Sequence, residues 1–323
     1  MNYIEQSNGS VDGFALIKTI EKKINVKGVP YLTMTLCDKD GEISAKLWDY
    51  REELHGTYEV NDLIKFRGQL QQYNGADQLR IDRIRKTIDA DGVNICDFVP
   101  SSEYSGEMML GEILNTLDTF RDADLKNLTK AIVDSHKDKL LYWPAAFKLH
   151  HAMRGGLLYH TLSILKMAEC ACRIYPSIDR ELLLSGVILH DIAKLYEYDV
   201  NETTGVAASY SVKGNLLGHL VMGAMEIEKT ARKLGVPEET TVLLEHMIIS
   251  HHGEPEFGAA VRPLFIEAEV LCQLDTLDAT VYEMAQSIGE VKKGEFTQRQ
   301  WALDDRKLYN HGRKPVKPKA NLD

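Results

Sequence analysis

The spacing of apolar residues changes once along the chain, near residue 100, and this change constrains the fold more than any other feature. Before it, short apolar runs alternate with polar residues between turn signals, which is typical of antiparallel strands. After Pro100 the apolar repeat becomes helical and stays so. We therefore expect an α+β multidomain chain in which a small β-barrel precedes a helical region.

Five strands are expected in the first part. The clearest covers residues 31–37, where Leu32, Met34 and Leu36 face one side and the residues between them face the other. The five strands span residues 14–24, 31–37, 42–48, 63–70 and 78–84, with turns predicted at 38–41 and 73–75. Five strands in so short a segment predict a small, closed or nearly closed five-stranded barrel.

The helical part is expected to hold two connecting helices and five longer ones. These span residues 107–120, 124–135, 157–175, 180–198, 216–234, 237–251 and 263–288. The predicted organisation is an OB-type barrel at residues 1–98, a helical connector at 99–145, an all-α domain at 146–290 and a basic tail at 291–323. The tail is expected to be disordered, either as a solubilising segment or as an arm that follows a nucleic-acid backbone.

Composition excludes several classes of protein. The net charge of -10 argues against bulk attraction to nucleic acid, although a local basic groove remains compatible with it. No apolar run reaches the 18 residues of a membrane span, and the first residues do not resemble a signal peptide. The five cysteines are an odd number without a CxxC pair, so neither a disulfide framework nor a thiolate zinc site is expected. We expect a cytoplasmic protein with no membrane partner.

Eight of the eleven histidines lie between residues 150 and 252. His160 opens one predicted helix, His190-Asp191 closes an apolar run, and Asp275 lies inside the apolar run of another helix. A buried carboxylate beside imidazoles is costly unless a positive charge pairs with it, and a metal ion supplies that charge. Imidazole and carboxylate ligands suit Mn, Fe, Co, Ni or Zn, and two ions can share one aspartate. We therefore expect metal binding by at least His160, His190, Asp191 and Asp275.

These residues carry a resemblance to the HD superfamily of metal-dependent phosphohydrolases, because HDIAK at residues 190–194 is similar to its HDxxK signature. The segments GNLLGH, ending at His219, and SHHG, with His251 and His252, resemble the places where two-metal members supply further ligands. The whole chain resembles YhaM-type 3'→5' exoribonucleases, which join an OB-fold to an HD domain. The phrases GVPYLTMTL, AKLWD, PAAFKLHHAMRGGLLYHT and LDTLDA add to this resemblance.

The resemblance and the chemistry together imply a role for each residue. The first ion takes His160, His190, Asp191 and Asp275, while the second shares Asp191 and adds His219 with His251 or His252. Lys194 is expected to steady a phosphate oxygen, with a solvated lysine at the helix end as the alternative. Two divalent ions per chain are expected, with Mn²⁺ first and Fe, Co, Ni or Zn as alternatives. Some relatives place a glutamate ligand where this chain has Gly156, so no third ion is expected.

Three further residues border this set. His150 and His151 are candidates for substrate contact, with a structural role as the alternative. Asp278 lies one helical turn beyond Asp275 and is expected to orient a metal ligand. His246 is about 140° around a helix from His251 and is left out of the ligand set.

The barrel is expected to bind a single strand through aromatic and basic side chains. Alternation places Tyr31 on the outward face of one strand, and Lys46 and Trp48 on that of the next. Tyr73 is a weaker candidate in a hairpin. The alternative is that Trp48 packs against the helical domain or a second copy of the chain.

The expected function is metal-dependent removal of nucleoside monophosphates from the 3' end of single-stranded RNA, with single-stranded DNA as a second substrate. One alternative is a phosphodiesterase or nucleotidase that acts on small nucleotides. Another is a non-catalytic DNA-binding factor with a structural metal. The partners expected are single-stranded nucleic acid and a second copy of the chain in a homo-oligomer.

Overall fold

The computed structural model describes residues 3–5 and 9–322 of the chain. It divides into two compact units. The first comprises Met1–Ser101 with Asn201–Thr204, and the second comprises Ser102–Val200 with Gly205–Asp323. Each unit has its own hydrophobic core and is described by itself.

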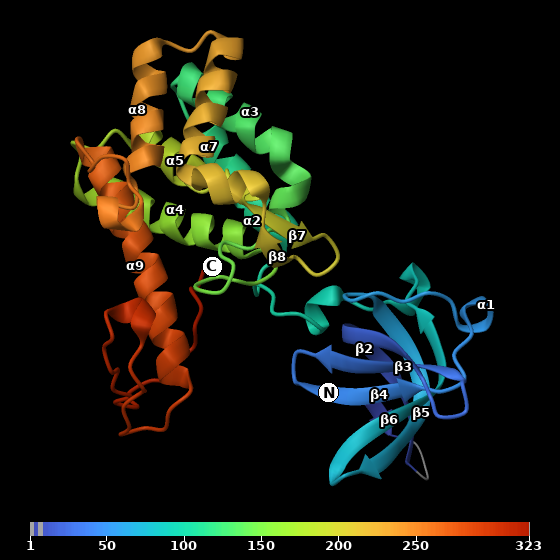
Figure 1. The fold of residues 1–323 in the computed structure, drawn as a ribbon. Coiled ribbons are helices and arrows are strands. Elements are labelled where there is room, and N and C mark those ends of the chain that lie inside the picture. Colours follow the sequence, from blue (N-terminus) through green and yellow to red (C-terminus); the bar gives the residue numbers. More distant parts are fainter. Residues whose placement is uncertain (1–2, 6–8, 323) are drawn as a thin grey trace. The chain divides into compact units, whose positions relative to one another are not determined.

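The first unit is a closed barrel, as the alternation predicts. Its strands are β1 (Tyr3–Glu5), β2 (Ser10–Ile24), β3 (Pro30–Asp38), β4 (Gly41–Leu47), β5 (Leu63–Tyr73) and β6 (Ala76–Lys86), and a short helix α1 (Glu52–His55) follows β4. The long strand β2 pairs with β5 along its first half and with β3 along its second half. Parallel pairing of β4 with β6 completes the ring (Figure 1). The sequence did not predict β1, which pairs with β2 beside this ring.

The barrel core follows the predicted faces. Leu32, Met34 and Leu36 are buried inside with Ala45 and Leu47 of the neighbouring strand. The two predicted turns also form. Asp38 Oδ1 accepts hydrogen bonds from the two turn amides that follow it. At the other hairpin, Asn74 and Gly75 both have positive φ, as a type I′ turn requires.

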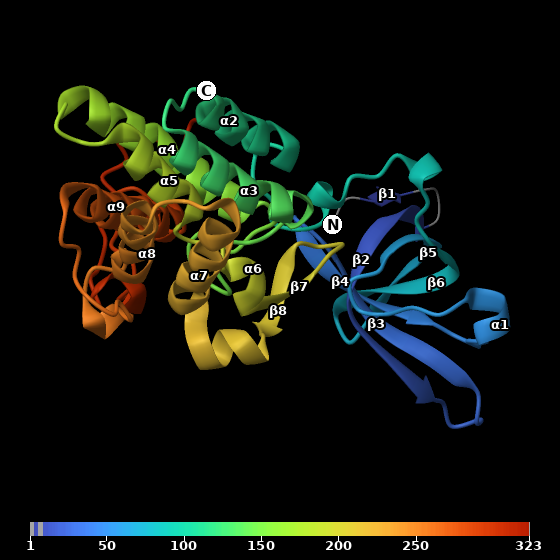
Figure 2. The same cartoon turned by 90° about the horizontal axis from the view of Figure 1, so that it is seen from above.

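The second unit is helical and packs around one core. Its helices are α2 (Gly106–Asp118), α3 (Ala123–Leu140), α4 (Gly156–Ile174), α5 (Arg180–Leu189), α6 (Lys194–Glu197), α7 (Val212–Leu234), α8 (Glu238–Ser250) and α9 (Ile266–Gly289). In Figure 2, α5 lies among α3, α4, α8 and α9, while α2 packs against α3 and α4, and α7 packs against α3 and α8. The two helices expected as a connector, α2 and α3, share the core of the other helices.

Capping side chains explain where several helices begin. Ser105, Asp122, Asp179 and Ser211 stand at the N-caps of α2, α3, α5 and α7, and each side chain accepts a hydrogen bond from an amide of the first turn. Such caps satisfy amides that have no partner inside the helix. A long apolar face on each helix then drives packing into the common core.

The helix predicted over residues 180–198 is wrong in its second half. Helix α5 ends at Leu189, a tight turn carries His190 to Ala193, and the short helix α6 follows. The amides of Ile192 and Lys194 donate hydrogen bonds to the carbonyls of Leu189 and Asp191, three residues earlier. Such bonds wind the backbone more tightly than the bonds of an α-helix do. The region is also not purely helical, because β7 (Tyr198–Asn201) and β8 (Val206–Tyr210) form a hairpin that the sequence pattern did not indicate.

The expectation of a disordered tail is also wrong. After α9 the chain folds into a loop that is closed by the bridges Phe296–Tyr309 and Gln300–Arg306. The end of the chain then returns to the helical core, where the Tyr159 hydroxyl donates a 2.7 Å hydrogen bond to the carbonyl of Ala320. Buried Leu322 explains the ordering, because apolar burial offsets the entropy that a tail would keep.

Within the described residues, no helix combines the length and the apolar character that a bilayer-spanning segment needs.

Candidate metal centre

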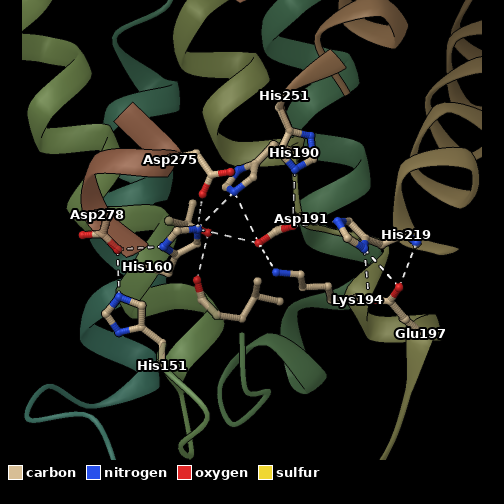
Figure 3. A network of polar contacts seen from close by, with 12 residues as sticks. His151, His160, His190, Asp191, Lys194, Glu197, His219, His251, Asp275 and Asp278 are labelled. Atoms are coloured by element: carbon tan, nitrogen blue, oxygen red, sulfur yellow. Dashed lines mark hydrogen bonds and ion pairs between the residues drawn. The ribbon is translucent and has the colours of Figure 1, made fainter. Parts of the chain in front are cut away.

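The imidazoles and carboxylates predicted as ligands come from three helices and two turns and lie close together. His160 comes from α4, His190 and Asp191 from the turn after α5, and Asp275 from α9. The remaining three are His219 in α7 and His251 and His252 after α8. Figure 3 shows His160, His190, Asp191 and Asp275 facing one another, with His219 and His251 on the other side of Asp191. Segments that are more than 100 residues apart in the sequence thus build one cluster.

The first group of atoms surrounds His160 Nε2. This atom lies 3.1 Å from Asp275 Oδ1, 3.3 Å from His190 Nε2 and 3.7 Å from Asp191 Oδ2. Atoms that each bind one ion at about 2.1 Å lie about 3.0 Å apart in octahedral and about 3.4 Å apart in tetrahedral geometry. The observed separations have the spacing of ligands around a single ion.

The second group lies on the other side of the same carboxylate. Asp191 Oδ1 is 3.4 Å from His219 Nε2 and 3.8 Å from His251 Nε2. Candidate ligand atoms of His219, His251 and His252 also lie within 4.8 Å of one another. Asp191 therefore directs one oxygen toward each group, as a bridging ligand would.

Three buried atoms of this second group have no hydrogen-bond partner. They are Asp191 Oδ1, His219 Nε2 and His251 Nε2. A buried polar atom without a partner costs about 1–3 kcal/mol, so three such atoms aimed at one point are expensive to keep in a protein. A divalent cation would satisfy all three at once, and the residues present therefore fit a metal ion.

Each histidine is fixed by its other ring nitrogen. The five Nδ1 contacts are His160 to Asp278 Oδ2 at 2.8 Å, His190 to the Val187 carbonyl at 2.8 Å, His219 to Glu197 Oε2 at 3.0 Å, His251 to the Ile248 carbonyl at 2.7 Å and His252 to the Phe257 carbonyl at 2.8 Å. Each acceptor favours a proton on Nδ1, which leaves the Nε2 lone pair for the cluster. This is the tautomer that a histidine ligand needs.

The electrostatics of the cluster favour positive charge at its centre. Burial alone would lower the pKa of His160, but the carboxylates of Asp275 and Asp278 raise it to about 10. Burial would raise the pKa of Asp191, yet Lys194 and His190 hold it well below its usual value. Asp191 is therefore ionised although it is 2% exposed. The cluster keeps its carboxylates charged and available to a cation.

Lys194 Nζ lies 2.6 Å from Asp191 Oδ2 and is itself buried. Burial would lower the pKa of Lys194, but the contact with Asp191 raises it. The lysine also lines the cleft beside the cluster. The structure thus pairs Lys194 with the carboxylate, and this rules out the alternative of a solvated lysine at a helix end.

The two neighbouring histidines before α4 have different surroundings. His150 lines the cleft together with Asp191 and Asp275, which keeps it as a substrate-contact candidate. His151 is buried instead, because its side chain is 1% exposed and its Nε2 lies 2.7 Å from Asp278 Oδ2, which suits the structural role given above as the alternative. Asp278 thus holds both His151 and His160, and its other oxygen accepts a hydrogen bond from Ser163. This is the orienting role expected for Asp278.

The cleft beside the cluster has a volume of about 680 Å³ and lies wholly within the helical unit. Asp191, Lys194, His219, His252 and Asp275 form its polar end. Aromatic and aliphatic side chains line the rest, including Phe147, Tyr198, Tyr210, Phe257 and Trp301. A polar end beside an aromatic wall suits a ligand that carries both a phosphate and a base.

On the barrel, the four predicted nucleic-acid-binding residues form one cluster. The rings of Tyr31 and Trp48 stack with their centroids 4.6 Å apart. Lys46 Nζ lies 5.3 Å from the centre of the Trp48 ring and 5.1 Å from that of Tyr73. Trp48 is 40% exposed and Tyr73 is 57% exposed, so a flat aromatic surface with a positive charge faces solvent.

Comparison with known proteins supports the same reading. The chain is 37% identical to the 3'-5' exoribonuclease YhaM of Listeria monocytogenes over 301 residues, which is 93% of this chain and 95% of that protein. The protein of the same name from Listeria welshimeri is similar to the same extent. The chain belongs to the YhaM family of 3'-5' exoribonucleases. The match covers most of both chains rather than one module.

Two further comparisons concern the separate parts of this YhaM-family chain. The HD domain family matches residues 157–280, which contain all seven side chains predicted as metal ligands. Among solved structures, the chain is similar to the second OB-fold domain of replication protein A from Methanococcus maripaludis. The identity there is 16% over 23% of this chain and 80% of that domain, with a TM-score of 0.19.

Three residues of this family member were missed by the sequence reasoning. Glu197 contacts His219 through both the ring and the backbone amide, and thereby orients it. At Gly214 an added Cβ would lie 2.2 Å from the Glu197 carbonyl oxygen, and Gly218 has a φ of +68° that breaks α7 just before His219. The paired glycines of GNLLGH are the available signal, because close approach and positive φ both call for glycine.

Gly156, where some relatives are expected to carry a glutamate ligand, cannot hold a side chain in this backbone. An added Cβ would lie 2.0 Å from the carbonyl oxygen of His151. The cluster of this chain therefore has no carboxylate at that position.

Proposed function

We propose that this chain is a metal-dependent 3'→5' exoribonuclease that releases nucleoside monophosphates from single-stranded RNA. Asp191 carries the proposal. Its two carboxylate oxygens face two groups of histidines, and Oδ1 is buried without a hydrogen-bond partner. Such a carboxylate between two ligand sets suits two-metal hydrolysis of a phosphodiester.

We assign the ligands in two sets that share Asp191. His160, His190 and Asp275 complete the first, while His219, His251 and His252 complete the second. Imidazole and carboxylate ligands suit Mn²⁺, our first choice, and also Fe, Co, Ni or Zn. When bound, a pair of such ions neutralises charge on the phosphoryl oxygens and activates water for in-line attack.

The protein residues prepare the cleft for this chemistry. Asp278 and Glu197 keep His160 and His219 in fixed orientations, which lowers the reorganisation needed during the reaction. Lys194 holds its charge next to Asp191 at the mouth of the cleft, where it can contact a non-bridging phosphate oxygen. His150 lies on the same wall and is a second contact for the strand.

The barrel is assigned to strand capture. Tyr31, Trp48 and Tyr73 provide ring faces that accept any base, and Lys46 attracts the backbone. This surface does not distinguish ribose from deoxyribose, so single-stranded DNA is expected to bind as well. RNA is the preferred substrate in our proposal because the relatives are named for it.

The experiment is digestion of one oligoribonucleotide labelled at either end, in Mn²⁺. We expect the 3' label to appear at once in a mononucleotide and the 5' label to shorten one nucleotide at a time. Asp191→Asn should abolish both the release of the labelled mononucleotide and the shortening of the 5'-labelled strand. His246→Ala is the matched control, because His246 Nε2 accepts a hydrogen bond from Leu264 N outside the cluster, and this variant should keep wild-type activity.

Two outcomes of this digestion would overturn the proposal. Hydrolysis of free nucleotides without shortening of the oligonucleotide would indicate a phosphodiesterase or nucleotidase for small substrates. Binding without turnover, unchanged in Asp191→Asn, would indicate a DNA-binding factor.

We also propose that the enzyme acts in the cytoplasm, since all five cysteines are free thiols, as in proteins of reducing compartments. Homo-oligomerisation stays a prediction, which light scattering of the purified chain would check. The apolar side chains of Val212, Leu216 and Met225 on α7 are exposed in the single chain and would gain from such contact.

A further inference from the structure

The loop after α9 exposes its largest apolar side chain. Residues 301–303 form a single helical turn in which Leu303 is 4% exposed and Trp301 is 74% exposed. The loop thus buries the smaller residue and leaves the tryptophan in water. An exposed tryptophan does not contribute the free energy that burial of its apolar surface would supply. Its exposure therefore suggests that a ligand or partner covers it.

The loop holds this turn in place. The amide of Gln300 and the carbonyl of Arg306 are joined by a hydrogen bond on one side of the turn. Further along, Thr297 and Leu308 are joined by backbone and side-chain bonds and are both buried. These contacts make the loop a fixed support rather than a mobile tail, and Figure 1 shows it folded back at the end of α9. A ring held on such a support can act as a preformed platform.

Trp301 lies on the wall of the cleft that holds the metal centre. It lines this cleft together with Thr276 and Thr280 of α9, which continue the face that begins at Asp275. Phe257, which is 71% exposed, and Tyr210, which is 42% exposed, also present aromatic rings to the same cleft. The backbone carbonyl of Phe257 accepts a hydrogen bond from His252 Nδ1. The residue that carries this ring is therefore held beside the cluster.

We propose that Trp301 is a positioning residue that stacks on a nucleobase near the 3' end of the strand. The inference rests on the proposed function, since the cleft must accept a nucleic-acid strand. An indole presents a flat face that every base can stack on, so it positions a substrate without selecting its sequence. Because Trp301 and Asp191 line the same cleft, a base stacked on the indole would bring its phosphate toward Asp191.

The test uses single strands with 2-aminopurine at one of the three 3'-terminal positions, bound to the full chain in EDTA so that no cleavage occurs. Stacking quenches 2-aminopurine. We expect quenching at one or more of these positions with wild type and with Trp301→Phe, and loss of it with Trp301→Leu. Tyr175→Ala removes a ring that is 60% exposed and lies outside this cleft, and this variant should behave as wild type. Equal fluorescence for wild type and Trp301→Leu at all three positions would overturn the proposal.

Kinetics in Mn²⁺ give the second readout. Trp301→Leu should raise KM by about 5- to 150-fold, the range that one base stack supplies, with little change in kcat. On strands that lack the three terminal bases, wild type and Trp301→Leu should have the same KM. A KM increase of the same size on the abasic strand would assign Trp301 a structural role. If wild type does not cleave at all, the proposed function fails, while the fluorescence experiment still decides the role of Trp301.

Discussion

Asp278 accepts a hydrogen bond from His160 Nδ1 at 2.8 Å, and through it a carboxylate outside the ligand set fixes the orientation of a ligand. The same oxygen lies 2.7 Å from His151 Nε2, so the carboxylate spans two histidines of which only one faces the cluster. The charge and the direction of His160 both depend on this contact. The relationship gives the first prediction.

Asp278→Asn should weaken metal binding about 10- to 100-fold, the usual cost of losing a partner behind a histidine ligand. Its neutral amide no longer favours a proton on His160 Nδ1 as a carboxylate does. The measurement is competition with a fluorescent chelator at fixed pH. Asp134→Asn, an exposed change on α3, is the control. An unchanged dissociation constant in Asp278→Asn would remove the orienting role from our account.

Gly218→Ala should lower the free energy of unfolding by about 1–3 kcal/mol, because alanine does not readily adopt a φ of +68° with a ψ of 163°. The strain falls next to His219, so binding of one ion should weaken as well. Thermal unfolding in EDTA measures the first effect and metal titration the second. Gly111→Ala is the matched control, since an added Cβ meets nothing within 4 Å there. Equal stability of Gly218→Ala and wild type would contradict the prediction.

Trp48→Ala should weaken binding of single-stranded RNA by about 5- to 150-fold, as one stacked base is lost. Lys46→Ala should instead lower the salt dependence, reducing the slope of log K against log salt by about 0.7. Fluorescence anisotropy at several salt concentrations separates the two effects. Leu54→Ala removes an exposed apolar side chain elsewhere on the barrel and serves as the control. Should Trp48→Ala bind as wild type does, the aromatic cluster is not the capture surface.

The acid stability of the barrel should depend on Asp91. Arg85 forms two 2.6 Å hydrogen bonds with this carboxylate and, with the Ile88 amide, holds the pKa of Asp91 well below its usual value. A lowered native pKa stabilises the fold above the unfolded value of about 3.9, and this contribution is lost as pH falls toward the native pKa. Asp91→Asn should therefore lower the urea midpoint at pH 7, and the difference from wild type should shrink at pH 3.

Asp89→Asn is the control for this experiment, because Asp89 lies in the same short turn as Asp91. A difference between Asp91→Asn and wild type that stays constant from pH 7 to pH 3 would show that the carboxylate charge is not the stabilising feature.

Much of the fold was predictable because its signals are local. The alternation of Leu32, Met34 and Leu36 specifies the strand face that enters the core. The pair Asn74-Gly75 specifies a hairpin, because both residues readily adopt the positive φ seen here. The break in the helix after Leu189 was not predictable in the same way. Its apolar residues continue the helical repeat, and the turn is set by contacts of Asp191 with distant residues.

The convergence of these histidines and aspartates was predictable because few structures explain buried aspartate among buried histidines. Its support was harder to see. Glu197 looks like an ordinary helix-end residue until α7 places His219 against it. His151 follows His150 directly, yet its backbone has a positive φ of 55°. Of the two side chains, it is that of His150 that lines the cleft. The order of the tail depends on Tyr159 and Ala320, which are far apart in the sequence.

Metal content tests the central claim most directly, because everything proposed for the cleft requires two cations that share Asp191. Wild type dialysed against Mn²⁺ and analysed by mass spectrometry of the elements should hold two ions per chain. His219→Ala/His251→Ala should hold one, and Asp191→Ala should lose both or bind them far more weakly. Wild type that takes up no divalent ion, or an Asp191→Ala variant that keeps two, would contradict the account.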